Sequence, residues 1–258
     1  MSVSNLAALP DAPTSATPEN LPEIFEYLPD IYFYVKDRQC RWKACNNASL
    51  SLFNARHKSE ILGRSEIEFF PRQIAEPILR DDRHVMETGE KIINKMEVIV
   101  DENGQLVWVA TTKLPTHAAD GTIDGIMGIT RIVRRTDMLP EGYRQYSRVI
   151  HFIQEHYGQA INIKDLASLS CLSESQFRKN FRRLFRMPPQ EFILRVRMQA
   201  AARQLVSTDE AIVEIALRSS FCDQSYFTHK FTLFFGLSPK KYRDRWRGSL
   251  AAEPLADP

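Results

Sequence analysis

The chain between positions 21 and 133 mixes two periods of apolar residues. Short runs that are rich in β-branched and aromatic side chains favour β-strands. The turn signals Asn103-Gly104 and Asp120-Gly121 separate the last three of these runs. We therefore predict three adjacent antiparallel strands joined by hairpins. The strand-like runs are residues 31–35, 97–100, 107–112 and 126–133.

The spacing of apolar residues between 46 and 89 is helical instead. One long helix is predicted from Gln73 to Thr88, because Gly89 follows it and glycine is the usual residue just past a helix end. Together these elements predict an α+β domain over residues 21–133, an antiparallel sheet with flanking helices.

Residues from about 160 onward contain an internal duplication. Apolar and small residues recur at an offset of 49, and after one insertion aromatic residues and a proline recur at an offset of 50. Each copy is typical of a short helix, a tight turn and a second helix with aromatic residues four apart. This pattern predicts two helix-turn-helix units, at about 160–186 and 209–236, in an all-α domain. The pairs include Leu166/Ile215, Ala167/Ala216, Phe177/Phe227, Phe181/Phe231, Phe185/Phe235 and Pro189/Pro239.

The second helix of each copy has a polar face opposite its aromatic face, and Ser173 and Asp223 precede the two helices as expected N-caps. An aromatic stripe alone fits an ordinary helical bundle. The polar face of the first copy, however, carries hydrogen-bonding and cationic side chains that can enter a DNA major groove, where Arg or Lys reads guanine. The face of the second copy is barely charged, so we expect the first copy to dominate base reading. The stripes are Ser175, Arg178, Lys179 and Arg182 in the first copy and Gln224, Ser225, Thr228, His229 and Thr232 in the second.

The segment between the two copies, residues 190–206, contains no Gly or Pro and favours one continuous helix. Such a helix spans about 26 Å, against about 34 Å between neighbouring major-groove windows on one DNA face. Cations in and around it could hold phosphates, although a solvated surface cation is the alternative for each one. The candidate phosphate-binding residues are Arg182, Arg195, Arg197, Lys240, Lys241 and Arg243.

Formal charge divides unevenly along the chain. Residues 139–248 contain 18 Lys and Arg against 10 Asp and Glu, whereas residues 1–138 contain 16 against 20. A basic segment beside an acidic one indicates that the C-terminal part meets a polyanion. A solvated surface with charge distributed by chance is the alternative.

Catalytic and metal-binding patterns are not found in the sequence. The four cysteines form no CxxC pair, the six histidines form no HxxxH pair, and no phosphate-binding loop or nucleophile elbow occurs. We therefore predict no enzymatic activity, no metal and no cofactor. No apolar run approaches the length of a membrane span, and no basic residue precedes Lys36 as a signal peptide requires. We expect a cytoplasmic protein with no membrane partner.

Residues 21–133 also carry a succession of short motifs. They are Tyr34-Val35-Lys36-Asp37, Asn46, Ile61-Leu62-Gly63-Arg64, Asp82, Thr88-Gly89-Glu90, Glu97, Trp108, Lys113-Leu114-Pro115, Gly121 and Gly125 to Thr130. Their order resembles a PAS domain. The resemblance implies a five-stranded antiparallel sheet flanked by helices, in a module that binds a small molecule, a cofactor or a protein. The sequence leaves a bound small molecule and its pocket residues undetermined, because the interior is expected to be generic apolar and aromatic.

Residues from about Tyr146 to Trp246 carry a second and more specific succession. Its closing part contains Ile215-Ala216, Ser219-Ser220-Phe221, Ser225-Tyr226-Phe227, Phe231, Phe235-Gly236 and Ser238-Pro239-Lys240-Lys241-Tyr242-Arg243. This stretch resembles the DNA-binding domain of the AraC family of transcriptional regulators. Arg218-Ser219-Ser220 stands where that family often has a glycine, which leaves the turn geometry open. The resemblance implies base contacts by Ser175, Arg178, Lys179, Gln224, Ser225, Thr228 and His229.

These patterns divide the chain into a disordered lead (1–20), a PAS-like domain (21–133), a helical connector (134–145), an AraC-type domain (146–247) and a disordered tail (248–258). The apolar spacing from Tyr143 to Ile153 predicts a helix packed on another element. We expect a sequence-specific transcriptional regulator that binds double-stranded DNA as a homodimer. RNA polymerase and a small-molecule effector are further partners to test. In one hypothesis the PAS-like domain senses a signal, and in the other it is only a dimerisation module.

Overall fold

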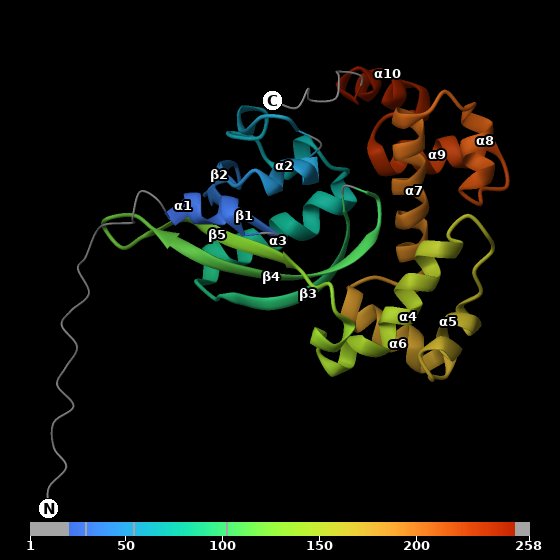
Figure 1. The fold of residues 1–258 in the computed structure, drawn as a ribbon, viewed down its shortest axis with the longest axis horizontal. Helices are drawn as coiled ribbons and strands as arrows, with labels where there is room; N and C mark the ends of the chain where they lie inside the picture. The colour runs from blue at the N-terminus through green and yellow to red at the C-terminus, as the bar shows by residue number, and fades with distance from the viewer. Residues whose placement is uncertain (1–20, 29, 54, 102, 251–258) are drawn as a thin grey trace, which may run out of the picture.

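The computed structural model describes residues 21–28, 30–53, 55–101 and 103–250. Figure 1 shows a sheet with its helices and, beside it, a wholly helical part whose upper and lower groups are joined by α7. The predicted disordered lead and most of the predicted tail lie outside the described residues. Residues 248–250, within the predicted tail, belong to the last helix.

The N-terminal part contains one antiparallel sheet in the order β2-β1-β5-β4-β3. The predicted strand-like runs become β1, β3, β4 and β5, and the last three strands pair as adjacent hairpins, as predicted. The sequence patterns do not predict β2, a four-residue strand at the edge of the sheet. The strands are β1 (Ile31–Asp37), β2 (Trp42–Cys45), β3 (Ile92–Val100), β4 (Leu106–His117) and β5 (Ile123–Ile132).

Helix α3 (Arg72–Thr88) packs on β4 and β5 and confirms the predicted long helix. It ends at Gly89, whose φ of 73° is a left-handed conformation that glycine adopts without steric cost. The shorter helices around the sheet are α1 (Leu21–Ile24), η1 (Phe25–Tyr27), α2 (Ala48–Phe53), η2 (Lys58–Glu60), η3 (Glu66–Glu68) and η4 (Thr136–Met138).

The face of the sheet under α3 buries charged side chains, so the expectation of a generic apolar and aromatic interior is wrong there. Lys36 of β1 donates from Nζ to Oδ2 of Asp82 at 2.6 Å and also pairs with Glu66. Lys113 of β4 pairs through Nζ with the other oxygen of Asp82, Oδ1, at 2.5 Å. These four side chains are at most 3% exposed. Because a buried charge without a partner is strongly destabilising, the pairs hold α3 to β1 and β4 as one unit. We call these four residues the ion cluster.

The C-terminal part consists of helices α4 to α10. Helix α7 is the predicted continuous helix, and it separates the two predicted helix-turn-helix units, α5–α6 and α8–α9. The side chain of Ser173 accepts a hydrogen bond from the Gln176 amide, and Asp223 accepts one from the Tyr226 amide, which confirms both predicted N-caps. The helices are α4 (Glu141–His156), α5 (Ile163–Leu169), α6 (Glu174–Phe185), α7 (Pro189–Ser207), α8 (Ile212–Arg218), α9 (Gln224–Phe235) and α10 (Pro239–Leu250).

The two tight turns share one backbone conformation. Cys171 in the first turn and Ser220 in the second have φ values of 55° and 61°, both left-handed. The turn at Ser220 therefore keeps the left-handed conformation that glycine favours, although it contains no glycine. The duplication extends to the backbone.

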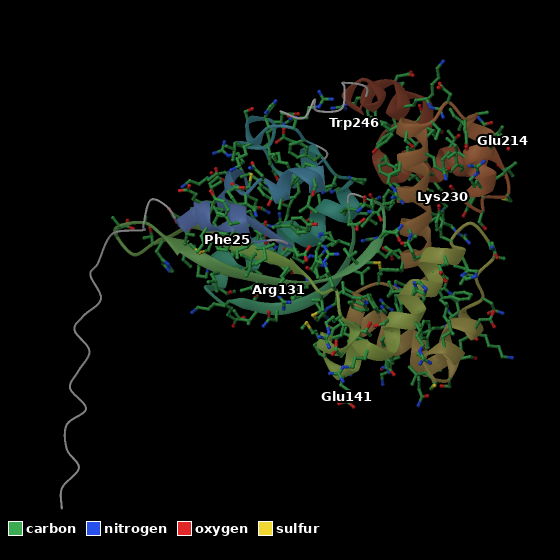
Figure 2. The ribbon with its side chains drawn as sticks, in the orientation of Figure 1. Phe25, Arg131, Glu141, Glu214, Lys230 and Trp246 are labelled. Atoms are coloured by element: carbon green, nitrogen blue, oxygen red, sulfur yellow. The ribbon has the colours of Figure 1, made fainter. Side chains whose placement is uncertain are left out.

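Two apolar clusters fill the helical part, and one of them is shared with the sheet. Met96 and Trp108, on the face of the sheet away from α3, belong to the same cluster as Tyr146 and Phe177. Helix α4 buries Tyr146 and Ile153 in it, which confirms the predicted packed helix. The predicted division at 145/146 falls inside α4. Figure 2 labels Glu141 at the start of this helix and Arg131 in the neighbouring sheet.

The second apolar cluster belongs to the second helix-turn-helix unit and the part of α7 that carries it. Met198 and Leu205 of α7 pack there with Phe227 and Phe231 of α9, all fully buried. None of the helices in the described part of the chain combines the length and apolarity that a bilayer crossing requires.

Candidate nucleic-acid interface

Helix α6 presents the polar stripe predicted for the first unit. Phe177 and Phe181 are fully buried, so the opposite side of the helix faces solvent. Ser173 and Gln176 form a reciprocal capping box that fixes where the helix begins. The exposed residues of the stripe are Ser175, Arg178, Lys179 and Arg182.

The Arg178 guanidinium is held by a carboxylate of the same helix. Its Nε and Nη2 atoms donate to Oε1 of Glu174 at 3.0 and 2.6 Å, while both side chains remain more than two-fifths exposed. A guanidinium has five N–H donors, so the Nη1 end is left to bond a base or phosphate. The sequence pattern that predicts the stripe does not include Glu174. The signal that finds it is a Glu four residues before an Arg on one helix face.

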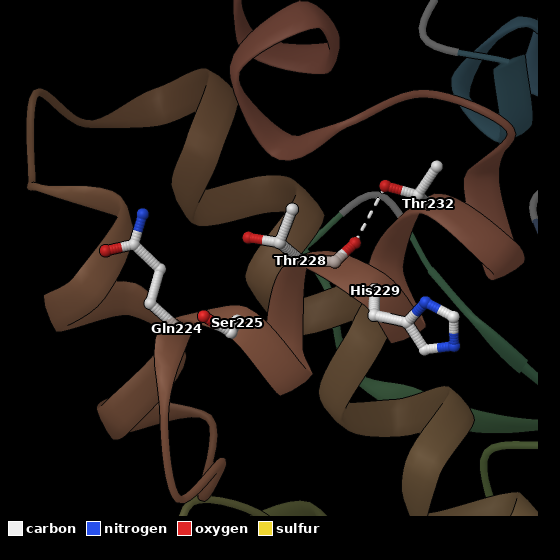
Figure 3. A pocket seen from close by; sticks show the side chains of 5 residues that line it. All are labelled: Gln224, Ser225, Thr228, His229 and Thr232. Carbon is white, nitrogen blue, oxygen red and sulfur yellow. Dashed lines mark hydrogen bonds between the residues drawn. The ribbon is translucent and has the colours of Figure 1, made fainter.

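Helix α9 carries the second stripe along an open hollow of about 670 Å³. Figure 3 shows five side chains along this one helix. The hydroxyl of Thr232 donates to the carbonyl oxygen of Thr228 at 2.7 Å, which uses its one donor. At the start of α9, the Tyr226 amide and the Cys222 thiol hold the pKa of Asp223 below its usual range, so the cap stays charged. The residues along the hollow are Gln224, Ser225, Thr228, His229 and Thr232.

The candidate phosphate-binding cations fall into two groups. Arg197 donates to two backbone carbonyls of the α4–α5 connection, and Arg243 donates to two near the end of α7. These guanidiniums tie helices together, and burial lowers the pKa of Arg197. Arg195 is only 19% exposed and pairs with Glu191. The exposed candidates are Arg182, Lys240 and Lys241.

The two stripes lie towards opposite ends of α7 (Figure 1). This helix has 19 residues and spans about 28 Å. Neighbouring major-groove windows are about 34 Å apart. The arrangement can therefore present α6 and α9 to two successive windows, with hydrogen-bonding side chains outward and aromatic side chains in the core.

Comparison with known proteins agrees with both parts of this architecture. A family model described as "Helix-turn-helix domain" matches residues 166–245, and one described as "PAS fold" matches residues 25–137. The chain is 26% identical over 145 residues to the probable transcriptional regulator LumQ of Photobacterium leiognathi, a match of 54% of this chain and 58% of LumQ. The chain thus spans less than two thirds of that relative.

Two further similarities concern the helical part. The chain is 30% identical over 97 residues to the HTH-type transcriptional activator AarP of Providencia stuartii, which covers 38% of this chain and 72% of AarP. It is 25% identical to the solved DNA-binding domain of AdpA in complex with a target DNA, at a TM-score of 0.39, over 41% of this chain and 96% of that one.

The fold and the duplicated, N-capped helices define a protein that joins a PAS domain to a helical domain with two helix-turn-helix units. The chain belongs to the AraC family of transcriptional regulators. From here on, the helical part, residues 141–250, is called the reader.

Proposed function

We propose that the chain regulates transcription by reading two blocks of a DNA site, one with α6 and one with α9. The observation that supports this most is the repeated geometry of these helices. Each has a buried aromatic face, a side-chain N-cap and an exposed polar face that begins in its first turn. Recognition helices contact base edges with their N-terminal residues, which is where these stripes begin.

The two units take different roles in this proposal. Arg178 and Lys179 supply charge and bidentate donors, so α6 contributes most of the discrimination between bases. Gln224 and His229 supply hydrogen bonds with little charge, so α9 contributes softer contacts. Arg182, Lys240 and Lys241 neutralise phosphates, which adds affinity without sequence information.

Selection of duplexes from a random pool at a fixed salt concentration near 0.1 M tests this proposal. We expect two conserved blocks about one helical turn apart, with Arg178→Ala relaxing the sequence of one block and His229→Ala that of the other. Arg183→Ala is the matched control, because Arg183 is an exposed cation of the same helix that lies near Tyr146 instead. A pool that is never enriched, or an Arg183→Ala effect equal to that of Arg178→Ala, would count against base reading by α6.

We further propose that the PAS domain conveys a signal that changes the geometry of a homodimer on DNA. Supporting this, the sheet and the reader share one apolar cluster, so a change in one can reach the other. The binding of a small effector would raise the melting temperature and change dimer geometry or DNA affinity together. If every effector that binds leaves both the dimer geometry and the DNA affinity unchanged, signalling through this domain is excluded.

A second candidate role for the PAS domain is a dimerisation block without a ligand. The ion cluster favours it, because buried, paired charges already occupy the face of the sheet under α3. Mass spectrometry of the native protein, together with thermal shifts across candidate effectors, separates the two roles. A co-purifying molecule supports the sensing role. A dimer that contains no bound molecule and shows no thermal shift with any candidate effector supports the dimerisation role.

A further inference from the structure

The PAS sheet touches the C-terminal end of the first recognition helix. Trp108 of β4 is 8% exposed and packs at 5.7 Å, centroid to centroid, against Phe185, the last residue of α6. The same ring meets Tyr143 of α4 edge-on at 5.7 Å. Nearby, the Leu106 amide of β4 donates to the side chain of Gln154 on α4 at 2.8 Å. The first unit is thus held on the outer face of β4.

Helix α3 touches the C-terminal end of the second recognition helix. The Gln73 side chain donates from Nε2 to the carbonyl oxygen of Leu233 on α9 at 3.0 Å. Ile74, next to Gln73, packs against the apolar cluster of the second unit. Phe70 and Phe235 line the two sides of a groove between η3 and the α9–α10 turn.

A third contact joins the β3–β4 hairpin to α7. Arg203 of α7 donates from Nη1 to the carbonyl oxygen of Asn103 at 3.0 Å. Its guanidinium fills the place that a Cβ at Gly104 would take, at 0.6 Å from the ideal position. Gly104 therefore serves both the left-handed turn, with a φ of 78°, and the approach of the arginine.

The first two contacts fall at the same end of the two copies. Trp108 contacts Phe185 itself, and Gln73 contacts Leu233, two residues before Phe235, which is the position paired with Phe185. The two PAS elements involved, β4 and α3, are themselves joined by Lys113 and Asp82 of the ion cluster. Both α6 and α9 therefore contact one domain in addition to their attachment to α7.

We infer that the PAS domain is a brace that sets the separation of α6 and α9, with Trp108 and Gln73 as positioning residues on its two sides. The inference rests on the proposed reading of DNA by both helices. One inserted base pair displaces the second block by about 3.4 Å along the duplex and turns it by about 35°. A reader held by α7 alone can follow such a change by bending, whereas a braced reader must break contacts. The brace thus restricts the spacing between blocks, and it leaves the base preference within each block unchanged.

The experiment uses full-length protein and duplexes that carry the two selected blocks at the preferred spacing and at one and two base pairs more or less. For the wild type we expect at least a tenfold loss of affinity on moving one base pair from the preferred spacing. Trp108→Ala, and separately the double variant Gln73→Ala with Arg203→Ala, should reduce that loss to threefold or less. Tyr27→Ala on η1 is the control, because it removes an aromatic side chain that is 77% exposed, and this variant should keep the tenfold loss of affinity.

The outcomes separate this inference from the function on which it rests. If both brace variants keep the wild-type spacing penalty, the brace is wrong while two-block reading stands. If the wild type binds all the spacings equally, the brace is wrong while two-block reading stands. If it binds duplexes that lack one block as tightly as duplexes with both, two-block reading fails and the brace fails with it. If circular dichroism shows that Trp108→Ala does not fold, the double variant of Gln73 and Arg203 tests the brace. The two hydrogen bonds that it removes are exposed, so their loss should leave the fold intact. A loosened base preference within either block would assign these residues to base reading and overturn their positioning role.

Discussion

Left-handed residues end α6 and α9 and form the turns before them. Arg186 and Gly236 are equivalent positions that close α6 and α9, with φ values of 58° and 72°. A side chain costs about 1 kcal/mol in this conformation, whereas glycine has no such cost. The two copies therefore differ in local strain at the same point of the fold.

This difference predicts opposite effects of two substitutions. Arg186→Gly should raise the free energy of unfolding by about 0.5–1 kcal/mol, because relief of the left-handed strain exceeds the added entropy of the unfolded chain. Gly236→Ala should lower it by a similar amount, although a Cβ there meets open space. Chemical denaturation of both variants measures the effect. A loss of stability in Arg186→Gly would show that its side chain makes contacts worth more than the strain.

Glu174 provides a residue-scale prediction about DNA. Its carboxylate repels phosphates and also orients the Arg178 guanidinium. Glu174→Gln should therefore strengthen binding to unrelated DNA several-fold and weaken discrimination at the base pair that we propose Arg178 to contact. Glu191→Gln is the control, since Glu191 forms the same type of pair with Arg195 on α7. Measured affinities for matched and mismatched duplexes at one salt concentration test this. Equal changes in both variants would leave only a general charge effect.

Among the elements, α3 depends on the ion cluster for its attachment to the sheet. Asp82→Asn removes the carboxylate that Lys36 and Lys113 share, and a buried cation is then left without its partner. We expect a loss of about 3–5 kcal/mol in the free energy of unfolding at pH 7. Glu76→Gln, which breaks an exposed pair with Arg83 on the same helix, should cost less than about 1 kcal/mol. Equal losses in the two variants would mean that burial of the cluster is not what matters.

The same cluster predicts the pH dependence of stability. Burial alone raises the pKa of Asp82, but the ammonium groups of Lys36 and Lys113 outweigh it and hold the pKa below the ordinary value of 3.8. The contribution of Asp82 is therefore complete above about pH 4 and is lost as pH falls through the lowered pKa. The stability difference between wild type and Asp82→Asn should shrink as pH falls below 3.8. Urea titrations between pH 7 and pH 2.5 measure it, and a difference that stays constant would exclude the shared carboxylate as the cause.

The elements that the sequence predicts are those whose signals are local. The C-terminal end of α3 follows from Gly89 and the start of α6 from Ser173, because caps and stops act within one turn. Strand β2 escapes prediction because four residues at a sheet edge carry too short an alternation. The ion cluster escapes it for another reason. Lys36 and Lys113 look like ordinary solvated lysines in the sequence, and Asp82 is 46 residues from one and 31 from the other.

In the whole molecule, the division into an acidic PAS part and a basic reader is predictable from composition, but the contact between them is not. From the sequence alone, Trp108 could belong either to the core of its own domain or to a contact with the helical part. The packing of β4 on α4 shows that it belongs to the contact. The polar stripes of α6 and α9 are predictable from periodicity because helix geometry fixes their spacing. The guanidinium of Arg197 is turned inward by carbonyls 38 and 40 residues away, which periodicity does not reveal.

The shared cluster predicts that β4 and α4 unfold together. Met96 and Trp108 from the sheet and Tyr146 from α4 fill one apolar core, so opening either side exposes the other. Trp108→Ala should therefore lower the hydrogen-exchange protection of amides in both β4 and α4 by about 3 kcal/mol, the cost of a large buried truncation. Amides of α9, whose core is the separate second cluster, serve as the internal control and should change much less. Loss of protection in β4 with α4 unchanged would mean that the sheet and the reader unfold independently, and the contact could then position the reader without stabilising it.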